Sequence, residues 1–354
     1  MATYITSEYT TGLIPITEPK LRELGAVFVT PTTALAEAYD GHEAWNPADE
    51  DPNRPGVDWR RPRSLVGNTS ALGPVRGQGL CGACFMMTAI SFIEAWVAIS
   101  TATKPVPLDD NQFIKCAFDP RNPDLTHGQC GGWESIEYAN VIVSTMCRGK
   151  WLASNPAKEF MFFDDDAPEK TKCDDWDSCQ NTKIPWPSCL SFKSKGVKSC
   201  SNFIPEWRRC NPTEMCSTNR DDRHQLHLPP TMKIHARALE TSLTRQQREA
   251  EMSTLLRVFG PFPVSILMDF DWPRYNSGLL VPKASAEKIV PPVNHEVLLV
   301  GDVVDKKYGQ MWIVQNSWGT QWGLNGFAYI SKNTDAYGKL GAFNILYGPI
   351  AYIE

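Results

Sequence analysis

The run of residues 84–96 is apolar on nearly every side. A helix with this pattern lies in the middle of a domain, because none of its faces suits water. The sequence therefore predicts a buried helix over this run. A second helix is predicted from a capping box at Thr244 and Gln247 to Val258, where Gly260-Pro261 ends it.

After the second helix the pattern becomes that of strands. Four short segments are rich in β-branched or aromatic residues and are bounded by turn residues, which is typical of strands. They are residues 263–267, 296–300, 311–315 and 327–330. Helices first and strands later indicate an α+β fold.

The composition indicates a globular protein and excludes two classes of partner. The chain has 354 residues, 42% of them hydrophobic, and a formal net charge of -5. Its lysines and arginines are scattered, so it offers no basic surface for nucleic acid or an anionic membrane. No apolar run approaches the roughly 18 residues of a membrane helix, and residues 1–30 lack the regions of a signal peptide. We therefore expect no nucleic-acid partner, no membrane insertion and no export signal in this sequence.

The eleven cysteines indicate an oxidising compartment, whether lysosome-like, secreted or other, because disulfides persist there. This expectation conflicts with the missing signal. Either the signal has been removed from the given sequence, or the protein travels by a non-classical route. Asn68 begins a glycosylation sequon, but such short motifs recur too often by chance to decide between these possibilities.

Four residues could supply the parts of a cysteine nucleophile. A thiol attacks a carbonyl well only as thiolate, and it needs an imidazole partner, a group that orients the imidazole, and donors for the oxyanion. Cys84 is the candidate nucleophile, because the start of a helix favours a thiolate. His295 is the candidate base and Asn316 the group that orients it. Gln78, six residues before the cysteine, is the candidate oxyanion donor together with the Cys84 backbone N–H.

Each of these residues, taken alone, has a simpler interpretation. A lone cysteine is more often a half-cystine or a buried structural thiol, and a lone histidine opening an apolar strand is more often a core residue. The surrounding motifs favour catalysis instead. They are Gln-Gly-Leu-Cys-Gly-Ala-Cys-Phe over residues 78–85 and Asn-Ser-Trp-Gly-x-x-Trp-Gly-x-x-Gly over residues 316–326.

On these motifs the chain resembles the papain family of cysteine proteases, and its later blocks are most similar to cathepsin B-like members. The resemblance covers roughly residues 57–147 and 240–350. It implies a two-lobe fold, with a helical left lobe, a β-barrel-like right lobe and the active-site cleft between them. It also implies a short helix at residues 108–116 and a substrate-binding strand at residues 129–133, and it requires neither a metal nor a cofactor.

The resemblance implies roles for further residues. A disulfide would join Cys81 to Cys130. Gly131 and Gly132 would bind the substrate backbone, although the asparagine that usually precedes this glycine pair is missing, which leaves the local register open. Trp318 would shield the bond between the catalytic histidine and asparagine from water.

Four residues match, by position, the sites that line the family's S2 pocket: Leu267, Val293, Glu296 and Ile345. We hypothesise that Glu296 admits an arginine or lysine side chain at P2, while Leu267 and Ile345 favour apolar side chains in the same space. The alternative is a glutamate that turns to solvent or to a nearby cation. A pocket carboxylate beside the catalytic histidine fits either interpretation.

The chain is expected to have two parts. Residues 1–55 precede the first family-like block and are predicted to be a propeptide and an exposed linker, or alternatively an ordinary N-terminal extension. Residues 56–354 would form the peptidase domain. Its Cys-rich insert, at about residues 148–230, has spacings that favour disulfides over zinc. The insert stands where cathepsin B carries its occluding loop but lacks that loop's adjacent histidine pair, so endopeptidase activity is expected.

The sequence thus predicts a cysteine endopeptidase that is made as a zymogen, cleaves protein or peptide substrates through an acyl-enzyme, and is inhibited by its own propeptide. One alternative is a catalytically idle binding or structural protein that uses the insert for recognition. The filled catalytic positions argue against it. Another is an acyltransferase with an amine acceptor, but no residue identifies such an acceptor.

Overall fold

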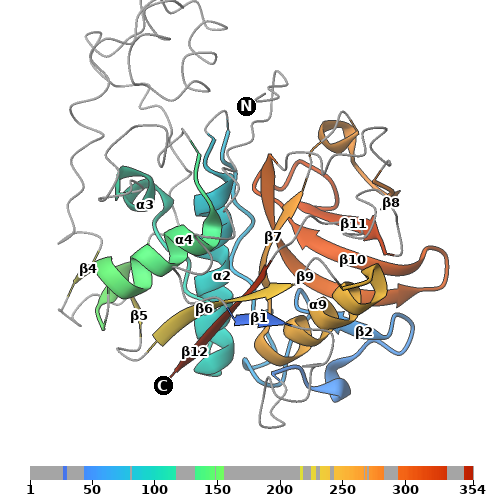
Figure 1. The fold of residues 1–354 in the computed structure, drawn as a ribbon, viewed down its shortest axis with the longest axis horizontal. Coiled ribbons are helices and arrows are strands. Elements are labelled where there is room, and N and C mark those ends of the chain that lie inside the picture. Colours follow the sequence, from blue (N-terminus) through green and yellow to red (C-terminus); the bar gives the residue numbers. More distant parts are fainter. Residues whose placement is uncertain are drawn as a thin grey trace, which may run out of the picture.

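The fold is taken from a computed structural model. It describes residues 27–29, 44–79, 82–116, 132–147, 149–154, 216–217, 225–228, 232–239, 243–266, 268, 271–282, 294–332 and 347–353. These residues form helices and sheets in two lobes; α2, α3 and α4 lie on the left of Figure 1, and the largest sheet lies on the right together with the helix Arg245–Phe259. The α+β prediction is confirmed.

The helical lobe is centred on α2 (Cys84–Ser100), which is buried along almost its whole length. Beside it lie α3 (Asp110–Cys116) and α4 (Ser135–Asn140), and α4 continues into a π-helical turn, η3 (Val141–Met146). The predicted buried helix and the predicted short helix are therefore both present. The apolar composition of α2 on all sides explains its position at the centre of the lobe.

The other lobe is built on a sheet of strand order β2-β9-β10-β11-β8, and β7 pairs with β9 outside this path. All four predicted strands are confirmed within it. The strands are β2 (Gly56–Asp58), β7 (Phe262–Ile266), β8 (Leu279–Leu280), β9 (His295–Asp305), β10 (Gly309–Gln315) and β11 (Phe327–Ser331). A 3-10 turn, η5 (Trp272–Arg274), precedes β8.

The predicted capping box is present at the start of α9 (Arg245–Phe259). The Thr244 N–H donates to the Gln247 side-chain oxygen at 2.8 Å, and the Gln247 N–H donates to the Thr244 hydroxyl at 3.2 Å. The helix ends at Gly260, whose φ of 94° favours glycine. A small sheet of β1 (Val27–Val29), β6 (Met232–Leu239) and β12 (Tyr347–Ile353) brings distant parts of the chain together.

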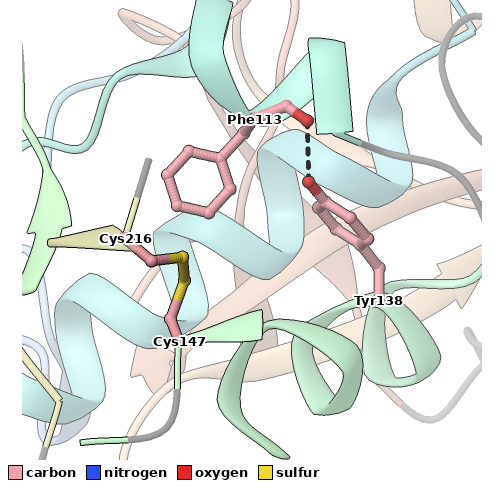
Figure 2. Close-up of a disulfide and its surroundings, with 4 residues drawn as sticks. All are labelled: Phe113, Tyr138, Cys147 and Cys216. Atoms are coloured by element: carbon pink, nitrogen blue, oxygen red, sulfur yellow. Dashed lines mark hydrogen bonds between the residues drawn. A yellow bond between two sulfur atoms is a disulfide. The ribbon is translucent and has the colours of Figure 1, made fainter. Parts of the chain in front are cut away.

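The two ends of the Cys-rich insert meet at one small sheet. Its strands are β3 (Trp151–Ala153), β4 (Cys216–Ser217) and β5 (Gln225–His227), in the order β4-β3-β5. A disulfide joins Cys147, just after η3, to Cys216 in β4, and the Tyr138 hydroxyl donates to the Phe113 carbonyl nearby (Figure 2). This cross-link fastens the returning end of the insert to the helical lobe.

The segment before β2 is anchored in the core of the domain. Trp45 is 1% exposed, and its backbone N–H donates to a carbonyl near the end of α9. Its ring meets Trp59 edge-on, and the buried Arg63 guanidinium lies 3.2 Å from the centre of the Trp45 ring. The turn η1 (Pro47–Asp49) follows. The predicted linker is therefore exposed in part, and it directly follows a core residue.

Candidate active site

The proposed base and its orienting group are hydrogen-bonded. His295 is the first residue of β9, and Asn316 directly follows β10, the neighbouring antiparallel strand. Nε2 of His295 lies 2.8 Å from the Asn316 side-chain oxygen, which also accepts from the Ser317 N–H at 2.8 Å. The Trp318 ring stacks on the imidazole at 4.9 Å between ring centres, and both residues are buried. The bond is thus shielded from water by the residue that the resemblance implied.

Gln78 is held by the same motif. Its backbone N–H donates to the Ser317 carbonyl at 2.8 Å, and its side-chain oxygen accepts from the Ser317 hydroxyl at 2.5 Å. A bridge between Gly77 and Trp318 adds to this contact. Because the amide oxygen is engaged by Ser317, the amide N–H₂ group points to the other side, as an oxyanion donor requires.

Cys84 lies at the N-terminus of α2 and is not disulfide-bonded. One helical turn later, the Thr88 hydroxyl donates to the Glu296 carbonyl at 3.3 Å. Residues four apart lie on the same helix face, so Cys84 faces the start of β9, where His295 stands. Nδ1 of His295, the ring nitrogen opposite the Asn316 bond, has no hydrogen-bond partner among the described groups. It is the nitrogen available to a thiol.

The described state holds a neutral imidazole. Complete burial lowers the pKa of His295 to about 4, and the hydrogen bond to Asn316 offsets only part of this shift. Cys84 is likewise fully buried. A thiolate–imidazolium pair would therefore form only after the site opens to water.

Glu296, which follows His295, is fully buried, and no salt bridge to it is found among the described residues. Its Oε2 accepts from the Ser135 N–H at 2.9 Å and from the Ser135 hydroxyl at 2.5 Å, at the start of α4. The solvent-facing interpretation of this residue is thus wrong. Glu134 is also buried, and it lies close enough to Glu296 for each carboxyl group to shift the pKa of the other.

A buried ionic cluster supports the loop before Gln78. The Arg76 guanidinium contacts Glu94 of α2 and Asp110 of α3, each at 2.5 Å. The Arg76 carbonyl accepts from the Gly319 N–H at 2.8 Å. The cluster therefore links both helices to the loop and to the motif that holds Gln78.

Several predicted site residues lie outside the described residues: Cys81, Cys130, Gly131, Leu267, Val293 and Ile345. Gly132 is described, with a φ of 92°, and the chain enters α4 three residues later. Sequence reasoning missed Glu134, Arg76 and Ser317 as parts of the site. Only Ser317 had a signal, since it lies inside the motif that begins at Asn316.

Within the described ranges, no three histidine, cysteine or acidic side chains are grouped as metal ligands would be. The helices of the same ranges include none with the length and apolarity to cross a membrane.

Comparison with known proteins places the chain in context. The family model described as papain family cysteine protease matches residues 54–345. The chain is 24% identical over 287 residues to pro-cathepsin H of Mus musculus, covering 80% of this chain and 61% of that protein. It is 39% identical over 281 residues to the viral cathepsin of Epiphyas postvittana nucleopolyhedrovirus, covering 79% of this chain and 60% of that protein.

The chain thus spans about three fifths of these curated relatives, whose names are those of cathepsin H and a viral cathepsin rather than cathepsin B. Among solved structures, one of mite allergens Blo t 1 and Der p 1 matches with a TM-score of 0.53 and 18% identity. It covers 96% of this chain and 78% of that one. This likeness shows the fold.

Proposed function

Because the chain belongs to the papain family of cysteine proteases, we propose that it hydrolyses peptide bonds with Cys84 as nucleophile and His295 as base and acid. Asn316 orients the imidazole, and Gln78 donates to the oxyanion. The observation that carries the proposal is the bond between His295 Nε2 and Asn316, which leaves Nδ1 on the side of the α2 N-terminus. An amide can hold the ring in this way without adding a second negative charge.

The reaction follows from these roles. The Cys84 thiolate adds to the substrate carbonyl carbon, and the oxyanion receives hydrogen bonds from the Gln78 amide and the Cys84 N–H. The His295 imidazolium then gives its proton to the amine as the C–N bond breaks, which leaves a thioester. Water attacks the thioester while His295 accepts its proton, so that the carboxylic acid leaves and the thiolate returns.

The protein is proposed to be a zymogen. Full burial of Cys84 and His295 excludes substrate from the described state, and burial keeps the imidazole neutral. The anchoring of Trp45 supports a processing site before Ala44 instead of one at residue 55. Cleavage at residue 55 would separate the Trp45 ring from the chain that its packing stabilises.

Endopeptidase cleavage of proteins or peptides remains the proposed activity, since the insert lacks the adjacent histidine pair of cathepsin B. An S2 pocket lined by Leu267, Val293, Glu296 and Ile345 is likewise proposed. Glu296 would have to leave Ser135 to bind a basic P2 side chain. The test compares the hydrolysis of P2-Arg and P2-Leu peptides by the parent enzyme and by Glu296→Ala. If the ratio of the two rates is the same in both proteins, Glu296 does not select the P2 side chain.

The experiment that tests the proposed function is mass spectrometry after treatment with an epoxysuccinyl inactivator. It compares the full chain with protein trimmed before Ala44, and Cys84→Ala serves as the matched control. We expect a label at Cys84 only after trimming. A folded, trimmed protein with intact disulfides that takes no label would instead support the idle binding protein.

A further inference from the structure

Two buried carboxyl groups lie on either side of Ser135, and one of them belongs to Glu296, the residue that follows the proposed base His295. Glu134 is the N-cap residue of α4 and Glu296 is the second residue of β9; their exposures are 1% and 0%. One oxygen of each group is committed. Oε2 of Glu134 accepts from the Glu137 N–H at 3.0 Å, and Oε2 of Glu296 accepts from Ser135. The remaining Oε1 atoms receive no hydrogen bond from any N–H or hydroxyl group among the described residues.

A proton shared between these two oxygens would satisfy both of them. Two ionised carboxylates in contact inside the protein would repel one another in a low dielectric, where each charge is also costly to bury. When one group is protonated, its O–H donates to the other carboxylate, and the repulsion becomes a charge-assisted hydrogen bond. The pair therefore takes up at least one proton as part of its folded structure.

The pair also bridges the two lobes next to His295. Glu134 and Ser135 begin α4 in the helical lobe, whereas Glu296 belongs to β9 in the sheet lobe. Since His295 and Glu296 are neighbours on one strand, a bond that fixes Glu296 also fixes the backbone that carries the imidazole. We propose that the Glu134–Glu296 pair, sharing a proton through its Oε1 atoms, is a positioning device that holds His295 toward α2 and releases it when that proton is lost. This inference rests on the proposed function for its catalytic consequence.

Among the described residues, the groups that bond to the pair or to its backbone carry no positive charge. On α4 they are Ser135 and Glu137, which act through their N–H and hydroxyl groups. On α2 it is Thr88, whose hydroxyl donates to the Glu296 backbone carbonyl. Ser265 is the partner of Glu296 on β7. No lysine or arginine is among the groups that act most strongly on either carboxyl in the described part of the chain.

The direction of the pH effect follows from the pKa values. Burial raises the pKa of Glu296 to about 7, and burial together with the neighbouring Glu296 raises the pKa of Glu134 well above its usual range. Carboxyl groups with a raised pKa in the folded state stabilise it at low pH and lose that contribution as the pH rises through the folded value. The connection between the lobes is therefore intact at acidic pH and is lost on the alkaline side.

The test compares the pH profiles of kcat and KM for the activated full chain and its variants. Glu296→Gln accepts from Ser135 through its amide oxygen and donates to Glu134 through its N–H₂ group, so its bond needs no shared proton. We expect the alkaline fall in kcat to move upward by about one pH unit or more, with KM unchanged. Glu296→Ala should lower kcat at every pH, by about 10- to 100-fold. Glu137→Gln, on the same helix, is the control and should keep the parent profile.

A second readout does not depend on proteolysis. In the inactive Cys84→Ala protein, infrared spectroscopy should show a protonated carboxyl band at neutral pH that disappears in Glu134→Gln/Glu296→Gln. The His295 ring resonances should shift at the same pH as this band is lost, and should not do so when Glu296→Gln is added. An absent band, or His295 resonances that ignore its loss, would overturn the proposal. If both signals behave as expected but the parent cleaves no peptide at any pH, the proposed function alone fails.

Discussion

Removal of the Arg76 guanidinium should be among the most damaging single changes in the chain. Its side chain is 4% exposed, and it neutralises Glu94 at 0% and Asp110 at 15% side-chain exposure. An Arg76→Met variant keeps most of the volume but leaves two carboxylates buried without their cation. Breaking a buried ion pair by removing one partner costs about 3–5 kcal/mol of unfolding free energy.

The pH dependence of this loss gives a sharper test. Burial already raises the pKa of Glu94 and Asp110 even though Arg76 opposes the shift. Without the cation, both pKa values should rise further, so the carboxylates of the variant take up protons on mild acidification. A raised folded pKa is stabilising below the unfolded value and destabilising above the folded one. The penalty should therefore be largest at neutral and alkaline pH and should shrink toward pH 4.

The assay is urea unfolding followed by intrinsic fluorescence, with Cys84→Ala as the background to prevent self-cleavage. Arg61→Met is the matched control, since Arg61 contacts Asp51 at 2.6 Å with 41% and 29% of the two side chains exposed. An exposed pair of this kind contributes only about 0–1 kcal/mol. A second change, Glu94→Gln in the Arg76→Met background, should recover part of the loss. Equal penalties for Arg76→Met and Arg61→Met, or no pH dependence, would refute the reasoning.

Three further predictions concern other parts of the chain. Trp45→Ala should lower the unfolding free energy by about 3–5 kcal/mol, whereas Leu65→Ala, at a 39% exposed position, should change it little; similar values for both would contradict the anchoring of the N-terminal segment. Replacing the Cys147–Cys216 disulfide by two serines should lower the unfolding free energy by about 2–5 kcal/mol relative to the disulfide-bonded parent, as measured by thermal unfolding. The reduced parent is the control and should show the same loss. Burial lowers the pKa of His295 to about 4, so the closed state should lose up to about 3 kcal/mol of stability as the pH falls from 6.5 through 4. Amide hydrogen exchange at the start of β9 should then accelerate on acidification. An exchange rate that stays constant, after correction for intrinsic exchange, would contradict this prediction.

Local signals were enough to predict the helices and strands and the contact between His295 and Asn316. The apolar run of α2, the capping box of α9 and the four strands depend on near neighbours in sequence, so periodicity predicted them. The pairing of His295 with Asn316 was predicted through a motif, and it forms because the two residues lie at matching ends of the antiparallel strands β9 and β10.

The remaining features depend on contacts that no local pattern encodes. Ser135 and Glu296 are 161 positions apart, and nothing around either residue indicates a partner in the other lobe. Trp45 precedes a Pro- and Asp-rich stretch that is typical of an exposed linker, yet the tertiary pocket formed with Trp59 and Arg63 takes up its ring. In each case, packing between distant segments outweighs local composition.

The two titrations around His295 act in opposite directions, and together they define an acidic working range. Acidification charges an imidazole that is buried neutral, which disfavours the closed state below pH 6.5. The Glu134–Glu296 pair keeps its shared proton over the same range, because the pKa of Glu134 is raised well above its usual range. At acidic pH the site is therefore driven to open while His295 is still held toward α2. At neutral pH the imidazole is neutral and enclosed, and only at a more alkaline pH, when Glu134 ionises as well, does the carboxyl pair lose the proton that joins the two lobes. The charge on His295 would thus control access to the site, and the neighbouring carboxyl pair would control the alignment of His295 within it.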